Sequence, residues 1–279
     1  MINFNGTLTD NTNISINNRG YRYGDYLFET IKVVNNKILF WEDHYFRLMA
    51  SMRILRMEIP MSFTMEFLQQ QILDTLNANA LQDSDAKVRL LVNRAEGGLY
   101  LPTNNTVDYI VTAEELPYDF YLLQDEQYEV DLFKDYYVSP DLLSTLKTNN
   151  KALNVVGSVY ASENDLDNCL ILNTNKNVVE ALNGNLFLLK DKMLKTPPLK
   201  DGCLKGIMRK QILDIARIIP EISVIEESIS PFELQKVDEM FITNVIQGIV
   251  PVTKYRKKTY RTEFSRSLLS KLNTKIRLD

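Results

Sequence analysis

The stretch YLFETIKVVNNKILFW at residues 26–41 constrains the fold most, because it predicts a β-hairpin. Both halves are rich in β-branched and aromatic side chains, which favour strands. Asn35 and Asn36 between them tolerate the positive φ angles that a tight turn requires. This part of the chain is therefore expected to form antiparallel strands.

The pattern then changes to a helical one in EDHYFRLMASMRILRM. Apolar residues recur at helical spacing, and Glu42 and Asp43 lie in the first turn, where the helix dipole favours acids. Pro60 ends this helix. Ser62 is the expected N-cap of a second helix that runs to about Ala80.

The remaining elements alternate without long βαβ regularity. Strands are expected at 87–94, 107–113, 128–134, 169–173, 178–181, 185–190, 221–227 and 238–243. Helices are expected at 152–165, 206–218 and 262–277. This order favours a mixed α/β or α+β fold over a doubly wound sheet. The acidic, aperiodic segment EELPYDFYLLQDEQ predicts a linker at 116–123, between a small N-terminal domain (1–115) and a larger C-terminal domain (124–279).

The composition excludes several classes of protein. The 279 residues are 45% hydrophobic and 24% charged, which is ordinary for a globular protein. A net charge of −4 gives no reason to expect a nucleic acid or an anionic membrane as partner. A single histidine, His44, and two cysteines without a CxxC motif predict no metal site. Without a visible signal peptide or transmembrane-length apolar run, we expect a soluble, cytoplasmic protein.

Two lysines, Lys147 and Lys151, lie in STLKTNNKALNVVGSVYASEN at residues 144–164. A lysine attacks a carbonyl group only when it is neutral, and partial burial favours that form. Lys151 directly precedes a predicted helix in which Gly157 allows close packing. The expected buried face of that helix consists of Ala152, Leu153, Val156 and Tyr160. The pattern alone also explains both lysines as exposed residues at a helix start.

Three other features are candidates for chemistry. Gly206 precedes an amphipathic helix, and the free N–H groups of a helix start bind phosphate. Glu180 lies in a half-buried, strand-like run, where a carboxylate needs an arginine or a protonated ring nitrogen as partner. Arg47 lies on the apolar side of its helix and requires a carboxylate or a phosphate. Each feature also has a structural explanation, but together with a lysine they are the groups that a pyridoxal phosphate site needs.

Six segments in chain order resemble the fold-type IV, or class IV, pyridoxal phosphate enzymes. This family includes branched-chain aminotransferases, D-amino acid aminotransferases and aminodeoxychorismate lyases. The segments are RGYRYGDYLFETIKV (19–33), HYFRLMAS (44–51), NKALNVVGSVYA (150–161), VVEALNGNLFLLK (178–190), TPPLKDGCLKGIMR (196–209) and DEMFITNVIQGIVPV (238–252). The resemblance implies a small N-terminal α/β domain, a larger C-terminal pseudo-barrel α/β domain, sites at the domain boundary, and a homodimer.

The resemblance also implies a role for each matching residue. Lys151 would bind the cofactor as a Schiff base and shuttle a proton, and Glu180 would keep the pyridine nitrogen protonated. Arg47 and the N–H groups of Ile207, Met208 and Val245 would hold the phosphate. The other cofactor-binding assignments are Asn154, Gly206 and Asn244. The assignments on the substrate side are Tyr26, Phe28, Arg89 and Arg94.

Three departures from the family pattern bear on the reaction. Met208 and Val245 stand where hydroxyl side chains are usual, and Tyr26 replaces the second glycine of a GDG motif. The leading hypothesis is an aminotransferase acting on an amino acid and a 2-oxo acid. The alternative is an aminodeoxychorismate lyase that releases pyruvate and forms 4-aminobenzoate, because GIMR resembles the lyase branch. A non-catalytic relative is disfavoured by the presence of Lys151, Glu180 and Arg47 together.

Overall fold

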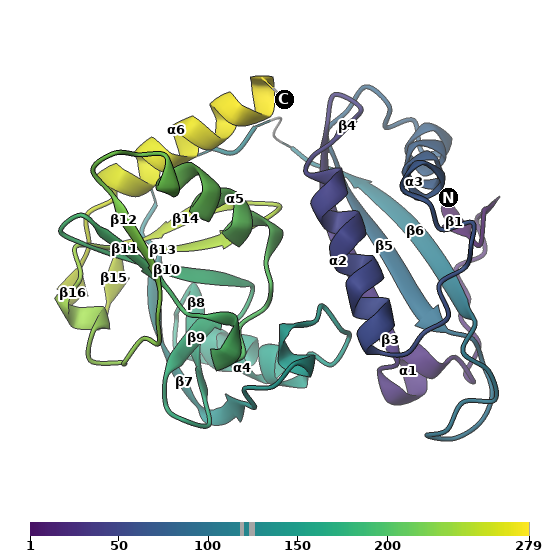
Figure 1. Cartoon of the computed structure of the whole chain (residues 1–279), viewed down its shortest axis with the longest axis horizontal. Coiled ribbons are helices and arrows are strands. Elements are labelled where there is room, and N and C mark those ends of the chain that lie inside the picture. The colour runs from purple at the N-terminus through teal and green to yellow at the C-terminus, as the bar shows by residue number, and fades with distance from the viewer. Residues whose placement is uncertain (118–119, 123–125, 279) are drawn as a thin grey trace. The chain divides into compact units, whose positions relative to one another are not determined.

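The computed structural model describes residues 1–117, 120–122 and 126–278, and the chain forms two compact units (Figure 1). The first unit comprises Met1–Phe120 and Lys147–Asn150; the second comprises Tyr121–Leu146 and Lys151–Asp279. Residues 118, 119 and 123 of the predicted linker lie outside the described residues.

The first unit is a six-stranded sheet against which the helices α2 and α3 pack. The strands are ordered β2-β1-β6-β5-β3-β4. They span β1 Ile2–Phe4, β2 Thr7–Thr9, β3 Tyr26–Val34, β4 Lys37–Ile38, β5 Ala86–Arg94 and β6 Val107–Glu115. The helices span α1 Arg19–Tyr23, α2 Trp41–Ile54 and α3 Met65–Ala78. Buried and half-buried residues alternate along β5, as expected when a sheet is covered on one face.

The predicted hairpin is confirmed. Strands β3 and β4 pair antiparallel, and Asn35 and Asn36 adopt φ angles of 48° and 60° in the turn. The predicted N-cap of the second helix is wrong by two residues, because Thr64 rather than Ser62 accepts a hydrogen bond from the N–H of Phe67. Two hydroxyl residues, Ser62 and Thr64, precede this helix, and Thr64 is the one that caps it.

The segment Lys147–Asn150 belongs to the first unit, although the sequence placed it in the larger domain. It lies along an edge of β3: the N–H of Phe28 donates to the carbonyl of Lys147 at 3.0 Å, and the N–H of Asn149 donates to the carbonyl of Tyr26 at 3.2 Å. Such pairing across more than 100 residues has no local signal in the sequence.

The second unit contains a ten-stranded mixed sheet. Its main path is β12-β11-β10-β9-β8-β7-β15-β16, and β13 pairs with β10 and β14. The strands span β7 Glu129–Val138, β8 Asn168–Asn173, β9 Val178–Ala181, β10 Gly184–Lys190, β11 Met193–Thr196, β12 Ser223–Glu226, β13 Glu239–Asn244, β14 Gly248–Val252, β15 Lys254–Tyr255 and β16 Lys258–Thr259. Parallel and antiparallel pairs both occur, so the predicted mixed α/β fold is confirmed.

Three longer helices complete the second unit: α4 Ala152–Glu163, α5 Ile207–Arg217 and α6 Glu263–Leu278. The predicted buried face of α4 is wrong in part, because Ala152 and Val156 are exposed. The helix packs through Gly157, where a Cβ atom would lie 2.4 Å from Leu182 Cδ2. Close packing at one glycine therefore takes the place of a broad apolar face.

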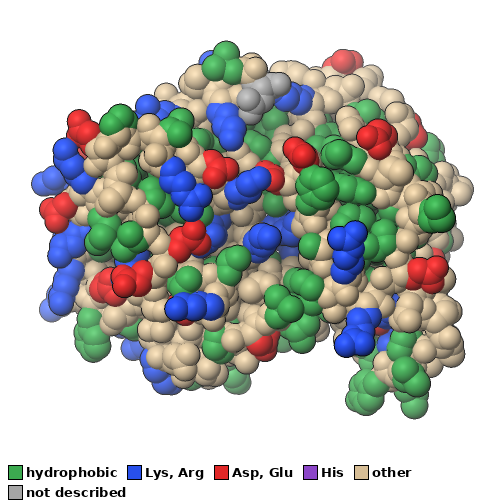
Figure 2. Space-filling view, viewed as in Figure 1, with side chains coloured by type: hydrophobic (Ala, Val, Ile, Leu, Met, Phe, Trp, Pro, Cys, Tyr) green, Lys and Arg blue, Asp and Glu red, His purple; other side chains and the backbone are tan. Residues whose placement is uncertain are grey.

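Among the described residues, no helix combines the length and the apolar character that crossing a bilayer requires. Basic and acidic side chains are interspersed on the face shown in Figure 2.

Glu239 anchors α6 from within the core of the second unit, and its replacement tests that anchor. Its carboxylate accepts hydrogen bonds from the N–H groups of Phe264 at 2.7 Å and Ser265 at 2.9 Å. We expect Glu239→Gln to lower the free energy of unfolding by about 1–3 kcal/mol, because one buried acceptor becomes a donor. Denaturant unfolding followed by circular dichroism measures this. Glu263→Gln, an exposed change in the same helix, is the control, and equal stability of both variants would contradict the prediction.

Candidate active site

Lys151 lies at the N-cap of α4 and is half-buried. Burial lowers the pKa of its ammonium group, and the charge of Glu180 raises that pKa by less. Lys151 therefore loses its proton to give the neutral amine more easily than a solvated lysine does. A neutral amine is the form in which a lysine attacks a carbonyl group.

Glu180 and Asn185 face each other on strands β9 and β10, and both bind the main chain of Leu204. Glu180 Oε2 accepts from the N–H of Leu204 at 2.9 Å. Asn185 Nδ2 donates to the carbonyl of Leu204 at 2.9 Å. One pair of side chains thus fixes the segment that leads into α5.

The N-terminus of α5 is open. Gly206 is the N-cap and has no side chain to bond the first turn; a Cβ atom there would lie 1.9 Å from Asn185 Oδ1. Within the described parts of the chain, the N–H groups of Ile207 and Met208 have no acceptor. Free N–H groups at a helix start can bind an anion.

The turn between β13 and β14 presents a third N–H group. Asn244 Oδ1 accepts from the N–H groups of Ile246 and Gln247, which holds the turn in shape. The carbonyl of Val245 accepts from the Tyr121 hydroxyl at 2.6 Å. The N–H of Val245 has no acceptor among the residues that the structure describes.

Asn154 ties α4 to the segment that follows β9, since its Nδ2 donates to the carbonyl of Leu182 at 2.7 Å. The second unit therefore contains Lys151, Glu180 and the three free N–H groups. The donor set fits a cofactor with an aldehyde, a basic ring nitrogen and a phosphate.

Arg47 lies in the first unit, where it forms a buried network with Glu29 and His44. Arg47 Nε donates to Glu29 Oε1 at 2.8 Å, and Arg47 Nη2 donates to Glu29 Oε2. His44 Nδ1 lies 2.7 Å from the same carboxylate. Burial raises the pKa of Glu29, but the charge of Arg47 and these hydrogen bonds outweigh burial and lower that pKa to about 2.

Tyr26, Phe28 and Arg89 lie on one face of the sheet of the first unit. Burial raises the pKa of Tyr26 to about 12, although Arg89 acts in the opposite direction, so the hydroxyl keeps its proton at neutral pH. The guanidinium carbon of Arg89 lies 5.1 Å from the centroid of the Phe28 ring. Arg89 forms no hydrogen bond or ion pair with any described residue.

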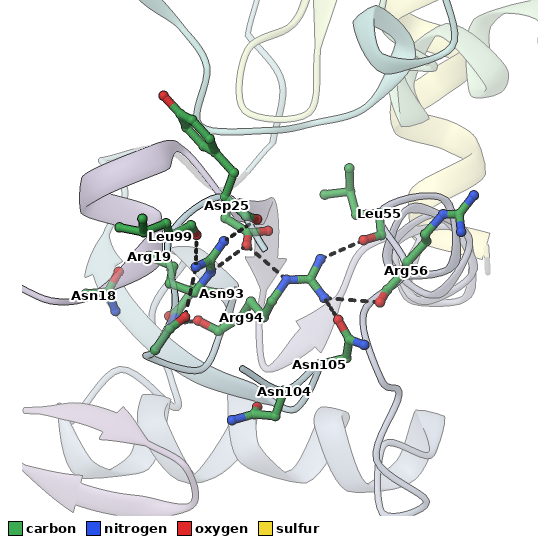
Figure 3. Close-up of polar contacts among 12 residues, drawn as sticks. Asn18, Arg19, Asp25, Leu55, Arg56, Asn93, Arg94, Leu99, Asn104 and Asn105 are labelled. Atoms are coloured by element: carbon green, nitrogen blue, oxygen red, sulfur yellow. Dashed lines mark hydrogen bonds and ion pairs between the residues drawn. The ribbon is translucent and has the colours of Figure 1, made fainter. Parts of the chain in front are cut away.

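Arg94 is bonded within a separate network around Asp25 (Figure 3). Its Nε donates to Asp25 Oδ2 at 2.9 Å, and its other nitrogens donate to the carbonyls of Leu55 and Arg56 and to Asn105 Oδ1. Arg19 approaches the same carboxylate oxygen at 2.9 Å. The network ties β5 to the loops around it.

Sequence reasoning gave no role to two residues that the structure brings forward. Asn185 belongs to the motif VVEALNGNLFLLK at residues 178–190. The glycine at 206 is the sequence signal that another side chain, here Asn185, lies close to the start of α5. The pattern explains Lys147 as an exposed residue at a helix start, but it is half-buried and its ammonium group lies 4.3 Å from the centroid of the Phe28 ring.

A lysine that has a carboxylate nearby and whose pKa is lowered by burial is typical of enzymes that bind carbonyl groups covalently. The sequence is more specific: the family described as amino-transferase class IV matches residues 26–255. The chain belongs to this family of enzymes, which confirms the resemblance seen in its motifs.

Relatives with different names match this chain over nearly its whole length. A Methanocaldococcus jannaschii protein, provisionally named a branched-chain-amino-acid aminotransferase, is 28% identical over 99% of this chain and 95% of its own length. The 4-amino-4-deoxychorismate lyase of Pseudomonas aeruginosa is 26% identical, with a TM-score of 0.84 and 98% of each chain covered. The Escherichia coli branched-chain amino acid aminotransferase has a TM-score of 0.88 at 21% identity, covering 99% of this chain and 94% of its own. The fold-type IV architecture is therefore confirmed.

The network of Glu29 predicts an acid-sensitive first unit. Because the folded-state pKa of Glu29 lies below its ordinary value of 4.5, its contribution to stability is present above that value and is lost as pH falls toward about 2. We expect the free energy of unfolding to fall over that window, and Glu29→Gln to flatten the dependence. Urea unfolding followed by fluorescence of Trp41, the single tryptophan, measures this. Glu114→Gln, at an exposed ion pair, is the control; an equal slope in Glu29→Gln would contradict the assignment.

Proposed function

We propose that this chain is a pyridoxal 5'-phosphate-dependent aminotransferase that moves an amino group between an amino acid and a 2-oxo acid. The observation that carries the proposal is the half-buried Lys151, because burial lowers its pKa. Glu180 and the open start of α5 lie in the same unit. Pyridoxal phosphate supplies an aldehyde that binds amines and a ring that accepts the electrons released at the substrate α-carbon.

The residues of the second unit have separate tasks. Lys151 would hold the cofactor through Nζ and would move the proton of the substrate α-carbon. The Glu180 carboxylate holds a proton at the pyridine nitrogen, and its bond to Leu204 fixes its direction. The N–H groups of Ile207, Met208 and Val245 bind the phosphate without the hydroxyl side chains usual in the family. Asn154, Gly206 and Asn244 shape this site through the contacts described above.

The residues of the first unit are proposed for anion recognition. Arg47 stays assigned to the phosphate, and Glu29 fixes the plane of its guanidinium group. Arg89 and Tyr26 are donors suited to a substrate carboxylate, and Phe28 supports Arg89. Arg94 is proposed as a structural residue instead of a substrate contact, because its guanidinium group already binds Asp25 and its neighbours.

The aminodeoxychorismate lyase remains the second candidate. The similarity to the Pseudomonas aeruginosa lyase structure favours it, together with the GIMR segment. Both reactions need the same removal of an α-proton by Lys151.

We propose that the protein is a homodimer in either case. Light scattering of the purified protein measures its oligomeric state.

The assignment of the lysine predicts opposite behaviour for two neighbours in the chain. Purified wild-type protein is expected to gain visible absorbance with pyridoxal phosphate and to fix the cofactor covalently after borohydride reduction. Lys151→Ala loses both properties and all turnover, because no amine remains to bind the aldehyde. Lys147→Ala keeps the covalent attachment. Mass spectrometry of the reduced protein identifies the modified lysine, and attachment that survives Lys151→Ala would overturn the assignment.

The choice of reaction predicts which product appears. We expect amino transfer from a panel of amino acids to 2-oxoglutarate, and no pyruvate from aminodeoxychorismate. A coupled assay for pyruvate beside chromatography of the amino acids measures both. Pyruvate release without transfer from any donor would replace the aminotransferase by the lyase.

A further inference from the structure

Tyr121 is the first residue of the second unit, and its hydroxyl group reaches the turn between β13 and β14. The hydroxyl donates to the carbonyl of Val245, 124 residues later in the chain, at 2.6 Å. The side chain is buried, and burial raises the pKa of Tyr121, so the hydroxyl keeps its proton and remains a donor. The turn proposed to bind phosphate is therefore tied to a distant segment of the same unit.

Tyr121 is itself held at its main chain and at its ring. Asn273 of α6 accepts from the N–H of Tyr121 at 3.3 Å and donates to its carbonyl at 2.9 Å. The ring packs on Gly248 at the start of β14, where φ is 75° and a Cβ atom would lie 2.6 Å from the ring carbon Cγ. The position of the hydroxyl is thus fixed by α6 on one side and by β14 on the other.

The peptide group between Val245 and Ile246 is bonded at both of its polar atoms. Its carbonyl accepts from Tyr121, and its N–H donates to Asn244 Oδ1 at 3.1 Å. A peptide group is planar, so two bonds fix its orientation. The N–H of Val245 belongs to the preceding peptide group, and only the φ and ψ angles of Val245 lie between the two. The bond from Tyr121 therefore helps to set the direction of that N–H.

This direction matters more in a chain with apolar side chains at 208 and 245. Met208 and Val245 offer a phosphate no hydroxyl, so only main-chain donors are available at these two positions. A hydroxyl hydrogen rotates to suit its acceptor, whereas an N–H turns only with its peptide group. Because hydrogen bonds weaken steeply when the donor is misaligned, an N–H must be held in the right direction in advance.

We propose that Tyr121 is a positioning residue for the phosphate of the cofactor: it holds the turn at Val245 in the orientation in which the N–H of Val245 binds phosphate. The inference rests on the proposed function and deepens it. Tyr121 makes no contact with the cofactor in this role. Loss of its hydroxyl therefore weakens recognition of the phosphate and leaves recognition of the aldehyde and the ring, by Lys151 and Glu180, unchanged.

Pyridoxal phosphate and pyridoxal, which lacks the phosphate, separate these two kinds of recognition. Tyr121→Phe keeps the ring over Gly248 and removes the hydroxyl. We expect it to raise the Kd for pyridoxal phosphate roughly fivefold, the usual effect of losing one hydrogen bond, and to leave the Kd for pyridoxal within about twofold. Titration of both compounds into cofactor-free full-length protein, followed by visible absorbance, measures the two constants. The kcat at saturating cofactor is expected to stay within about twofold.

Tyr260→Phe is the matched control. Tyr260 is a buried tyrosine of the same unit whose hydroxyl also donates to a main-chain carbonyl, that of Leu234 at 2.5 Å. Its loss is expected to lower the Tm, as in Tyr121→Phe, without changing the ratio of the two Kd values. Thermal unfolding of wild type and both variants separates a general loss of stability from a selective loss of phosphate binding.

Equal losses for both compounds in Tyr121→Phe, no loss for either, or the same selective loss in Tyr260→Phe would overturn the role of Tyr121 and leave the proposed function standing. A wild-type protein that binds neither compound would overturn the proposed function. Inorganic phosphate is then the probe: weaker binding to Tyr121→Phe than to wild type in a phosphorus NMR titration supports the role of Tyr121, and equal binding overturns it.

Discussion

Two side chains that bind the main-chain N–H and C=O of one residue, Leu204, organise the second unit. Glu180 and Asn185, opposite each other on β9 and β10, bind the N–H and the carbonyl of Leu204. Because both contacts are short and Asn185 is buried, the segment before α5 is fixed relative to the sheet. The carboxylate proposed for the ring nitrogen and the N–H groups of Ile207 and Met208 proposed for the phosphate are therefore set by the same two strands.

In the first unit, carboxylate side chains fix buried guanidinium groups in a similar way. Arg19 and Arg94 share the carboxylate of Asp25, and Arg47 is held by Glu29. A buried guanidinium group without such a partner is strongly destabilising, so these pairs explain where arginines can lie inside the unit. Arg89 is the contrast, because it lies half-buried over Phe28 without a carboxylate in the described chain. That contrast separates Arg94, proposed to hold the fold, from Arg89, proposed to meet a ligand.

Sequence reasoning succeeded where the signal was local. The turn at Asn35 and Asn36, the helix after it and the mixed order of elements follow from side-chain propensity and period. Strands β1 and β2 have three residues each, which is too few to show a period. The place of Lys147 depends on pairing with β3, which only the folded chain reveals. For the site, the motifs marked Lys151 and Glu180 as candidates, whereas the role of Asn185 required the path of the chain at Gly206.

The contact between Asn185 and Gly206 ties two distant positions to each other in evolution. Asn185 Oδ1 occupies the space that the first carbon of any side chain at 206 would need. A side chain at 206 thus requires the Asn185 side chain to move or to become smaller, and either change disturbs the bond from Asn185 to Leu204. The identities of residues 185 and 206 are therefore coupled, because a side chain at 206 competes for space with the group that binds Leu204.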